Sequence, residues 1–314
     1  DYRDPTDEEP ADQDTGGCAE LAGCTGGIYG EGGISSSPHF RKCVTGRRGF
    51  ACRWGQFTVY FGVADDCTPN GEGAVISKPY INLTLQLMEQ YGVKAEWNGQ
   101  TIKVRPQDYN PIPFTVESDW SAASYWYSMM ALSKNAEIEL LGLFKNSLQG
   151  DAAGAKLFAQ LGVGTTYTDR GVVLKHNGNR TKKLNYNFVN EPDLAQTFVV
   201  TCVLLNIPFR FTGLQSLKIK ETDRIQALIT ELNKLGYVVK SEQDSILIWN
   251  GERCEPASHP VIATYEDHRM AMAFAPAILR IPSIRIADPQ VVSKSYPGYW
   301  EDLKQVGFGI EIEE

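Results

Sequence analysis

One pattern recurs three times along the chain and restricts its fold more than any other feature. Each copy is a helical segment that ends in glycine and is followed by two short strand-like segments. The ending glycines are Gly92, Gly162 and Gly236, which lie 70 and 74 residues apart. Glycine best tolerates the left-handed backbone position that follows a helix. The spacing therefore predicts an internal repeat of a helix and a hairpin, in which each helix covers a sheet.

The residues after each glycine predict the hairpins. We expect strands at 93–97 and 101–104, at 163–168 and 171–174, and at 237–240 and 245–249. Asn98-Gly99 lies between the first two strands, and Asn250-Gly251 closes the third copy; Asn-Gly is a strong turn signal. In the third helix one apolar stripe recurs at helical spacing, formed by Ile225, Leu228, Ile229, Leu232 and Leu235. Together these signals predict an α/β protein.

Composition excludes several classes of protein. The formal net charge is −8 and the pI is near 5.2, which argues against a general nucleic-acid binder. No apolar run is long enough to span a bilayer and no secretory signal is visible, so we expect a cytoplasmic protein without a membrane partner. Five of the seven cysteines crowd the first 70 residues without CxxC or histidine spacing, so we predict neither a metal nor a cofactor. A secreted disulfide module fused to the α/β part remains an alternative.

The segment KIKETDR places charges of both signs just before the third helix. A helix N-terminus exposes unpaired N–H groups and favours anions. Lys220 and Arg224 are four residues apart, so we expect them to share a helix face and to seat a phosphate or carboxylate. Glu221 lies between them, where neighbouring charges would set its pKa for acid or base work. The alternative is a solvated helix start with local ion pairs.

Three other segments carry candidate functional residues. Asp193 lies in NEPDLAQT, His268 and Arg269 lie in YEDHRMAMAFA, and Lys294 lies in VVSKSYPGYW. Each has an ordinary structural explanation. Asp193 would be a helix cap, His268 a hydrogen-bonded surface residue, and Lys294 a solvated side chain. The residues taken singly leave these alternatives open.

Taken together, several segments closely resemble the 5-enolpyruvylshikimate-3-phosphate (EPSP) synthase family. They are KIKETDRI, YEDHRMAMAFA, DPQVVSKSYPGYWEDL, VISKPYINLTLQLM and VESDWSAASYW, and the resemblance runs from about residue 74 to the C-terminus. It implies transfer of the enolpyruvyl group of phosphoenolpyruvate to the 5-hydroxyl of shikimate 3-phosphate, with release of phosphate, in aromatic amino acid biosynthesis. It also implies the enolpyruvyl transferase fold, an inside-out α/β barrel of repeated βαβαββ units in two lobes, and a monomer.

The resemblance also implies roles for individual residues. Asp193 would be the base at the shikimate hydroxyl, Glu221 would handle the proton at the phosphoenolpyruvate methylene, and Lys220 would contact the reacting centre. Phosphoenolpyruvate would be held by Arg224, His268, Arg269 and Lys294. Shikimate 3-phosphate would be held by Ser77, Tyr80, Asp193, Ser216 and Lys220, although Ser216 stands where the family often has Asn. Two anionic substrates must meet in one site, so a cluster of cations is chemically sensible.

Residues 1–70 do not fit the resemblance as written. The family's Lys-Ser and Arg cluster, RMKxRP segment and Ser-Ser-Gln are not visible there. Read one nucleotide later, however, the degenerate codons of residues 56–69 permit SSQFISALLMIAP, and residues 4–19 and 30–38 permit other segments of the family. We therefore hypothesise that residues 1–70 are translated out of frame and that the frame is restored near Asn70–Gly71. A divergent or disordered extension is the alternative.

This hypothesis divides the chain and weakens its expected activity. Residues 71–115 would be a remnant of the N-terminal lobe, and residues 116–314 would be a nearly complete C-terminal lobe. Without the N-terminal donors, we expect at most feeble turnover. The alternatives for function are an inactive fragment with residual ligand binding, or a UDP-N-acetylglucosamine enolpyruvyl transferase.

Overall fold

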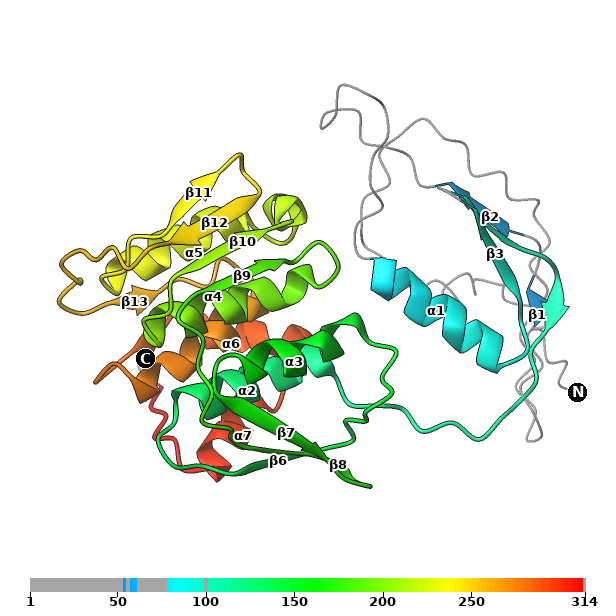
Figure 1. Cartoon of the computed structure of the whole chain (residues 1–314), viewed down its shortest axis with the longest axis horizontal. Helices are drawn as coiled ribbons and strands as arrows, with labels where there is room; N and C mark the ends of the chain where they lie inside the picture. The colour runs from blue at the N-terminus through cyan, green and yellow to red at the C-terminus, as the bar shows by residue number, and fades with distance from the viewer. Residues whose placement is uncertain (1–52, 55–56, 61–77, 99–100, 313–314) are drawn as a thin grey trace, which may run out of the picture.

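The computed structural model describes residues 53–54, 57–60, 78–98 and 101–312, which form an α/β architecture (Figure 1). The helices are α1 (Lys78–Gln90), α2 (Trp120–Leu132), α3 (Gly154–Ala159), α4 (Ala195–Leu204), α5 (Arg224–Lys234), α6 (His268–Phe274) and α7 (Tyr299–Gln305). Short 3₁₀ helices are η1 (Gly150–Ala153), η2 (Pro192–Leu194), η3 (Gln215–Ile219), η4 (Ala275–Leu279) and η5 (Pro289–Lys294). The strands are β1 (Arg53–Trp54), β2 (Phe57–Tyr60), β3 (Ala95–Asn98), β4 (Thr101–Val104), β5 (Gln107–Asp108), β6 (Ile138–Leu141), β7 (Val163–Tyr167), β8 (Gly171–His176), β9 (Leu184–Asn187), β10 (Phe209–Thr212), β11 (Lys240–Glu242), β12 (Ile246–Trp249), β13 (Val261–Ile262) and β14 (Arg285–Ile286).

The predicted helix–hairpin repeat is confirmed. Gly92, Gly162 and Gly236 have φ values of +85°, +99° and +86°, as left-handed residues after helices require. The hairpins β3–β4, β7–β8 and β11–β12 are antiparallel and follow α1, α3 and α5. Three sheets contain the same antiparallel neighbours, β2-β4-β3, β6-β8-β7 and β10-β12-β11. The strand predicted at 237–240 begins later, at Lys240, because Tyr237 forms an isolated bridge with Arg253.

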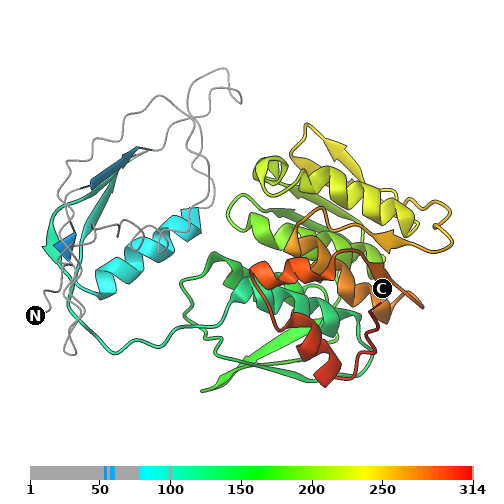
Figure 2. The ribbon, with the colours of Figure 1, turned by 180° about the vertical axis from the view of Figure 1, so that it is seen from behind.

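One βαβαββ unit is complete in the described part of the chain. It runs β9–α4–β10–α5–β11–β12, with β9 parallel to β10 and the other neighbours antiparallel. Figure 2 shows α5 along one face of this sheet. The predicted fold class is therefore confirmed at the level of the repeated unit. The described sheets stay separate and surround helices, so the closed barrel of the expectation is not seen among these strands.

The helices α2, α4 and α6 pack together at the centre of the larger body, with the β6–β8 and β9–β12 sheets on opposite sides (Figures 1 and 2). Nearly every residue of α2 and α4 is buried, as expected for helices that are apolar all round. Ser124 bonds Thr197 at 3.2 Å and Ser128 bonds Thr201 at 2.7 Å between their hydroxyl oxygens. Both pairs join residues 73 positions apart, so moving along α2 means moving in the same direction along α4. The two helices are therefore parallel and begin at the same end of the core.

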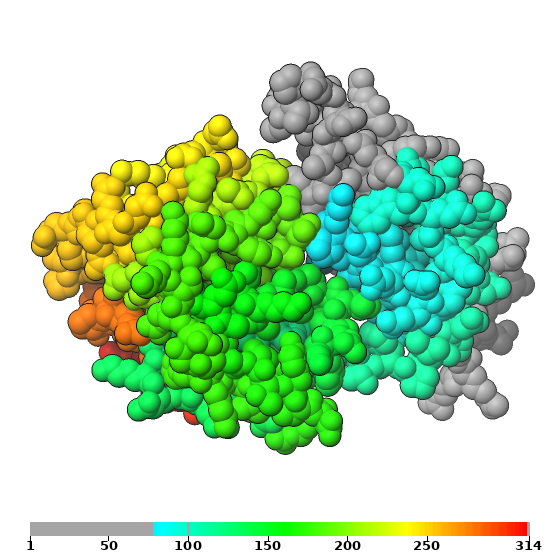
Figure 3. Space-filling model, in the orientation of Figure 1, coloured from blue at the N-terminus to red at the C-terminus, as the bar shows by residue number. Residues whose placement is uncertain are grey.

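The described residues form two separate hydrophobic cores. The large core extends from Trp120 to Leu303, while a small one joins α1 to β3 and β4 through Val93, Ile102 and Val104. The start of α1 nevertheless meets the larger body: a Cβ added to Gly150 would lie 2.6 Å from the Cβ of Pro79. Figure 3 shows the blue start of α1 against the green surface. The domain boundaries remain predictions.

Two further expectations concern residues 1–70 and membrane-spanning helices. Most of residues 1–70 lie outside the described ranges, although Phe57–Tyr60 forms β2 and pairs with β4. None of the helices within the described ranges has the length and hydropathy needed to cross a bilayer.

Candidate active site

The site is built where helices begin. Asp193 lies in η2, directly before α4. Arg224 is the first residue of α5, and Asp223 caps that helix by accepting from the Gln226 N–H at 3.0 Å. Arg269 is the second residue of α6 and donates its backbone N–H to Asp267 at 2.8 Å. Contacts between these side chains bring the starts of α4, α5 and α6 together.

Arg224 is the centre of this cluster. Its side chain is 1% exposed, and its guanidinium contacts three carboxylates. Nε donates to Asp267 at 2.7 Å, Nη1 to Asp193 at 3.0 Å and Nη2 to Glu221 at 2.6 Å. A buried charge is tolerated only when it is paired and hydrogen-bonded in this way. Arg224 therefore ties together segments that are far apart in the sequence.

The predicted helix face shared by Lys220 and Arg224 is wrong. Lys220 follows η3 with non-helical backbone angles (φ −82°, ψ −149°), and α5 begins only at Arg224. The loop still brings the two cations together, because Lys220 Nζ lies 3.7 Å from Asp193 Oδ1, the atom that also accepts from Arg224. The charges meet as expected, but through a turn rather than along a helix.

Asp193 contacts three cations. Besides Lys220 and Arg224, Arg269 Nη2 lies 3.1 Å from its Oδ2. Burial alone would raise the pKa of Asp193, but Arg269, Lys220 and Arg224 outweigh burial and hold that pKa below its usual value. Its side chain caps neither η2 nor α4, so the helix-cap alternative is not what the structure shows. Asp193 is a carboxylate at neutral pH.

His268 and Lys294 border this cluster. His268 is only 9% exposed, and burial, assisted by Arg269, lowers its pKa and keeps it neutral. Lys294, at the end of η5, donates from Nζ to the backbone oxygen of Glu266 at 2.8 Å. His268 Nδ1 and Ser216 Oγ are buried and have no hydrogen-bond partner among the described residues. Buried polar atoms normally have partners, so these two are suited to face a ligand or water.

The remaining predicted residues lie on or before α1. Ser77 falls outside the described residues. Tyr80 lies in the first turn of α1 with 62% of its surface exposed, next to the Pro79 that meets Gly150. A Cβ on Gly150 would also approach the backbone oxygen of Asn190, which lies just before η2. Gly150 is therefore near both Pro79 and Asn190, so the start of α1 lies close to the η2 helix that contains Asp193. The roles of Ser77 and Tyr80 remain predictions.

Comparisons with known proteins identify the family. The sequence model of one family, described as EPSP synthase (3-phosphoshikimate 1-carboxyvinyltransferase), matches residues 61–303. The chain belongs to the EPSP synthase family. The match includes every predicted site residue, from Ser77 to Lys294.

Curated relatives of the family are similar over most of this chain. A 3-phosphoshikimate 1-carboxyvinyltransferase of Bacteroides fragilis is 64% identical over 243 residues, which cover 77% of this chain and 59% of the relative. One from Vibrio campbellii is 34% identical over 242 residues, covering 76% of this chain and 55% of the relative. The matched region thus spans less than two thirds of the length of these EPSP synthase relatives.

Two solved structures share the fold. An EPSP synthase from Acinetobacter baumannii matches with a TM-score of 0.61 at 21% identity, covering 83% of this chain and 58% of that one. The enolpyruvyl transferase NikO from Streptomyces tendae matches with a TM-score of 0.52 at 18% identity, covering 82% and 56%. These likenesses confirm the enolpyruvyl transferase fold.

Two carboxylates of the candidate site were not among the predicted site residues. Asp267 is fully buried and joins Arg224 to α6. Asp151 lies in η1, accepts from the Ser121 hydroxyl at 2.5 Å, and has its pKa raised to about 6, chiefly by burial. The only sequence signals were the position of Asp267 before HRM and that of Asp151 in NSLQGD, which opens a repeat.

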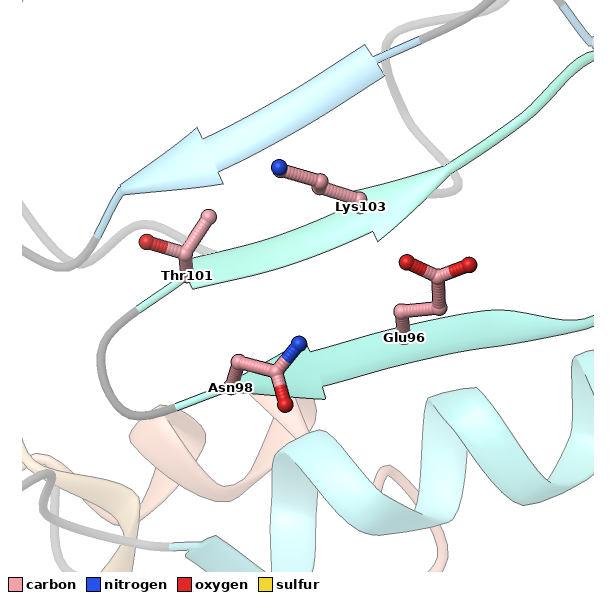
Figure 4. Close-up of a pocket in the computed structure, with 4 residues that line it drawn as sticks. All are labelled: Glu96, Asn98, Thr101 and Lys103. Carbon is pink, nitrogen blue, oxygen red and sulfur yellow. The ribbon is translucent and has the colours of Figure 1, made fainter.

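A shallow hollow lies elsewhere, on the β3–β4 hairpin. Glu96 and Asn98 line it from β3, and Thr101 and Lys103 line it from β4 (Figure 4). It contains none of the residues predicted for the EPSP synthase site. The candidate site at the helix starts is therefore separate from this hollow.

Proposed function

We propose that the chain carries the C-terminal part of the active site of a 3-phosphoshikimate 1-carboxyvinyltransferase. The reaction transfers the enolpyruvyl group of phosphoenolpyruvate to the 5-hydroxyl of shikimate 3-phosphate and releases phosphate. The observation that carries the proposal is the convergence of Lys220, Arg224 and Arg269 on the carboxylate of Asp193. A cationic site of this kind offsets the repulsion between two anionic substrates.

Asp193 and Glu221 supply the proton transfers in this proposal. Asp193 is ionised at neutral pH and accepts the hydroxyl proton as the oxygen bonds to C2 of phosphoenolpyruvate. Glu221 is partly exposed and bonded to Arg224, and it passes a proton taken from solvent to the methylene carbon. Glu221 then takes a proton back from the resulting methyl group while the bond between C2 and the phosphate oxygen breaks and phosphate leaves. Lys220 lies beside Asp193, where it contacts the reacting hydroxyl.

The cations around these two carboxylates would bind the substrates. Arg269, Lys294 and neutral His268 would hold the phosphoenolpyruvate carboxylate and phosphate. Arg224 would join them by exchanging part of its bonding to Glu221 and Asp193 for the incoming anion. Ser77, Tyr80 and Ser216 would contact shikimate 3-phosphate together with Lys220 and Asp193. We further propose a cytoplasmic monomer without nucleic-acid or membrane partners, which suits small charged metabolites.

The activity of the chain as written should be weak. We propose that residues 1–70 are an out-of-frame translation, residues 71–115 a remnant of the N-terminal lobe and residues 116–314 the C-terminal lobe. The N-terminal motifs that would complete both phosphate sites are then missing, and each lost charged contact costs about 2–5 kcal/mol. Resequencing the gene decides this point, since an intact reading frame encoding residues 1–70 as written would contradict it.

A phosphate-release assay with both substrates tests the proposed activity. It should compare this chain with a full-length version in which residues 1–70 are returned to frame. We expect turnover to recover in the corrected protein and to be lost on Asp193→Ala or Lys220→Ala. An inert corrected protein beside an active chain as written would contradict the proposal.

The alternative is an inactive fragment with residual ligand binding. Calorimetric binding of phosphoenolpyruvate without turnover in this chain would identify it. The UDP-N-acetylglucosamine alternative has no support, because the curated relatives described above carry the shikimate name.

A further inference from the structure

A left-handed turn stands directly before α6. Tyr265 and Glu266 have φ values of +54° and +57°, and neither residue is glycine. Bulky side chains rarely adopt this conformation, and two in succession need support from surrounding contacts. The turn leads into Asp267, His268 and Arg269, and its second residue offers the carbonyl that accepts from Lys294 Nζ at 2.8 Å. Its geometry therefore sets the distance between Lys294 and the start of α6.

The support comes from Glu231, a residue outside the predicted site. Glu231 lies on α5 and is fully buried. Its Oε1 accepts from the Tyr265 hydroxyl at 2.7 Å, and its Oε2 accepts from the backbone N–H of Ala263 at 3.1 Å. Lys234, one turn later on α5, donates to both Glu231 oxygens at 2.9 and 2.7 Å and to the backbone oxygen of Val261 at 3.0 Å. The Glu231 carboxylate therefore holds the segment that enters the turn at two groups, the backbone N–H of Ala263 and the hydroxyl of Tyr265.

The same helix also carries Arg224, which grips Asp267 at the far side of the turn at 2.7 Å. The backbone N–H of Asp267 donates to the Thr264 carbonyl at 2.9 Å and closes the turn. The turn is therefore held from α5 at two points, by Glu231 before it and by Arg224 after it. The Lys294 side chain is exposed, and its ammonium group is held by the Glu266 carbonyl of this turn.

We propose that Glu231 and Tyr265 are positioning residues that place Lys294 and the start of α6 for a single phosphoenolpyruvate-type anion. This inference rests on the proposed function for the identity of the anion. Neither residue contacts the reacting atoms. Glu231 holds the Tyr265 hydroxyl and so fixes the turn. The turn then places the Glu266 carbonyl, which Lys294 contacts, and the N-terminus of α6.

The test is Tyr265→Phe in the full chain, which removes one hydroxyl and keeps the ring. The matched control is Tyr127→Phe, which removes a hydroxyl bonded to Thr165 at 2.9 Å on the β7 side of α2. Two quantities are measured in each protein: the Kd for phosphoenolpyruvate by calorimetry, and amide hydrogen exchange of residues 263–270 without ligand.

We expect Tyr265→Phe to raise the Kd about three- to tenfold, because the lost bond to Glu231 orients the turn and does not itself contact the anion. Exchange in residues 263–270 should accelerate, and Tyr127→Phe should change neither quantity. The proposal is overturned if Tyr265→Phe weakens binding no more than the control, or if exchange in this segment is unchanged. If the parent chain binds no phosphoenolpyruvate, both variants are compared in the protein whose residues 1–70 are returned to frame. Absence of binding there contradicts the proposed function, and hydrogen exchange then decides for or against the support of the turn.

Discussion

Replacement of Asp267 by alanine tests the buried ion cluster on which the site depends. Asp267 is fully buried, and it accepts from Arg224 Nε at 2.7 Å and from Arg224 Nη2 at 3.4 Å. It also caps α6 through the Arg269 N–H at 2.8 Å. Removing one partner of a buried ion pair costs about 3–5 kcal/mol, and a lost N-cap about 1 kcal/mol.

Arg224 keeps Asp193 and Glu221 in this variant, so the expected loss falls at the low end of the combined range. We expect Asp267→Ala to lower the free energy of unfolding by about 4 kcal/mol. Asp267→Asn keeps one acceptor oxygen, which can still cap α6, but it turns an amide NH2 toward Arg224 Nε; it should cost about 1–3 kcal/mol. The assay is equilibrium unfolding in urea, followed by tryptophan fluorescence; Trp249 is buried in the same core.

The matched control is Glu242→Gln. Glu242 pairs with Arg210 at 2.8 Å, but the two side chains are 52% and 41% exposed, so the loss should be under about 1 kcal/mol and should shrink further in salt. If Asp267→Ala is as stable as this control, then the ion pair between Asp267 and Arg224 does not stabilise the fold, and the prediction is wrong.

Three further changes test the packing and the electrostatics. Asp151→Asn removes a carboxyl whose pKa is raised from 3.8 to about 6 in the folded chain, so the folded state holds the extra proton and the parent loses stability as pH rises between these values. The variant should equal the parent near about pH 4 and be more stable by up to about 3 kcal/mol near about pH 8, measured by urea unfolding. Gly236 has φ +86°, and a Cβ added there would lie 3.0 Å from the Cys254 carbonyl oxygen, whereas a Cβ added to Gly251 would meet nothing within 4 Å. Gly236→Ala should therefore lower the thermal midpoint more than Gly251→Ala. Equal shifts of the midpoint would contradict the close approach at Gly236. Phe198→Ala, fully buried between aromatic rings, should cost about 3–5 kcal/mol in the same urea assay, and a loss under about 1 kcal/mol would place it outside the core.

The repeated elements could be predicted because local rules decide them. A glycine at the left-handed position ends each helix, and the short strands that follow pair with their neighbours in the chain. The apolar stripe of the third helix is confirmed too, since Ile225, Leu228 and Leu232 are buried in α5. Such features depend on residues only a few positions apart.

The site could be predicted only as a set of residues. Periodicity suggested that Lys220 and Arg224 share a helix face, whereas a turn separates them and Asp193 joins them. The pairing of Arg224 with Asp267 spans 43 residues, and that of Tyr265 with Glu231 spans 34. Contacts of this range follow from how the helices pack, so no local sequence signal reveals that Arg224 is buried among three carboxylates.

The most direct measurement is a crystal structure of the chain with phosphoenolpyruvate and shikimate 3-phosphate bound. We expect the phosphoenolpyruvate anion to lie within hydrogen-bond distance of Arg269 and Lys294, with the shikimate hydroxyl against Asp193. Ligand density at the β3–β4 hairpin, or anywhere away from the starts of α4, α5 and α6, would contradict it.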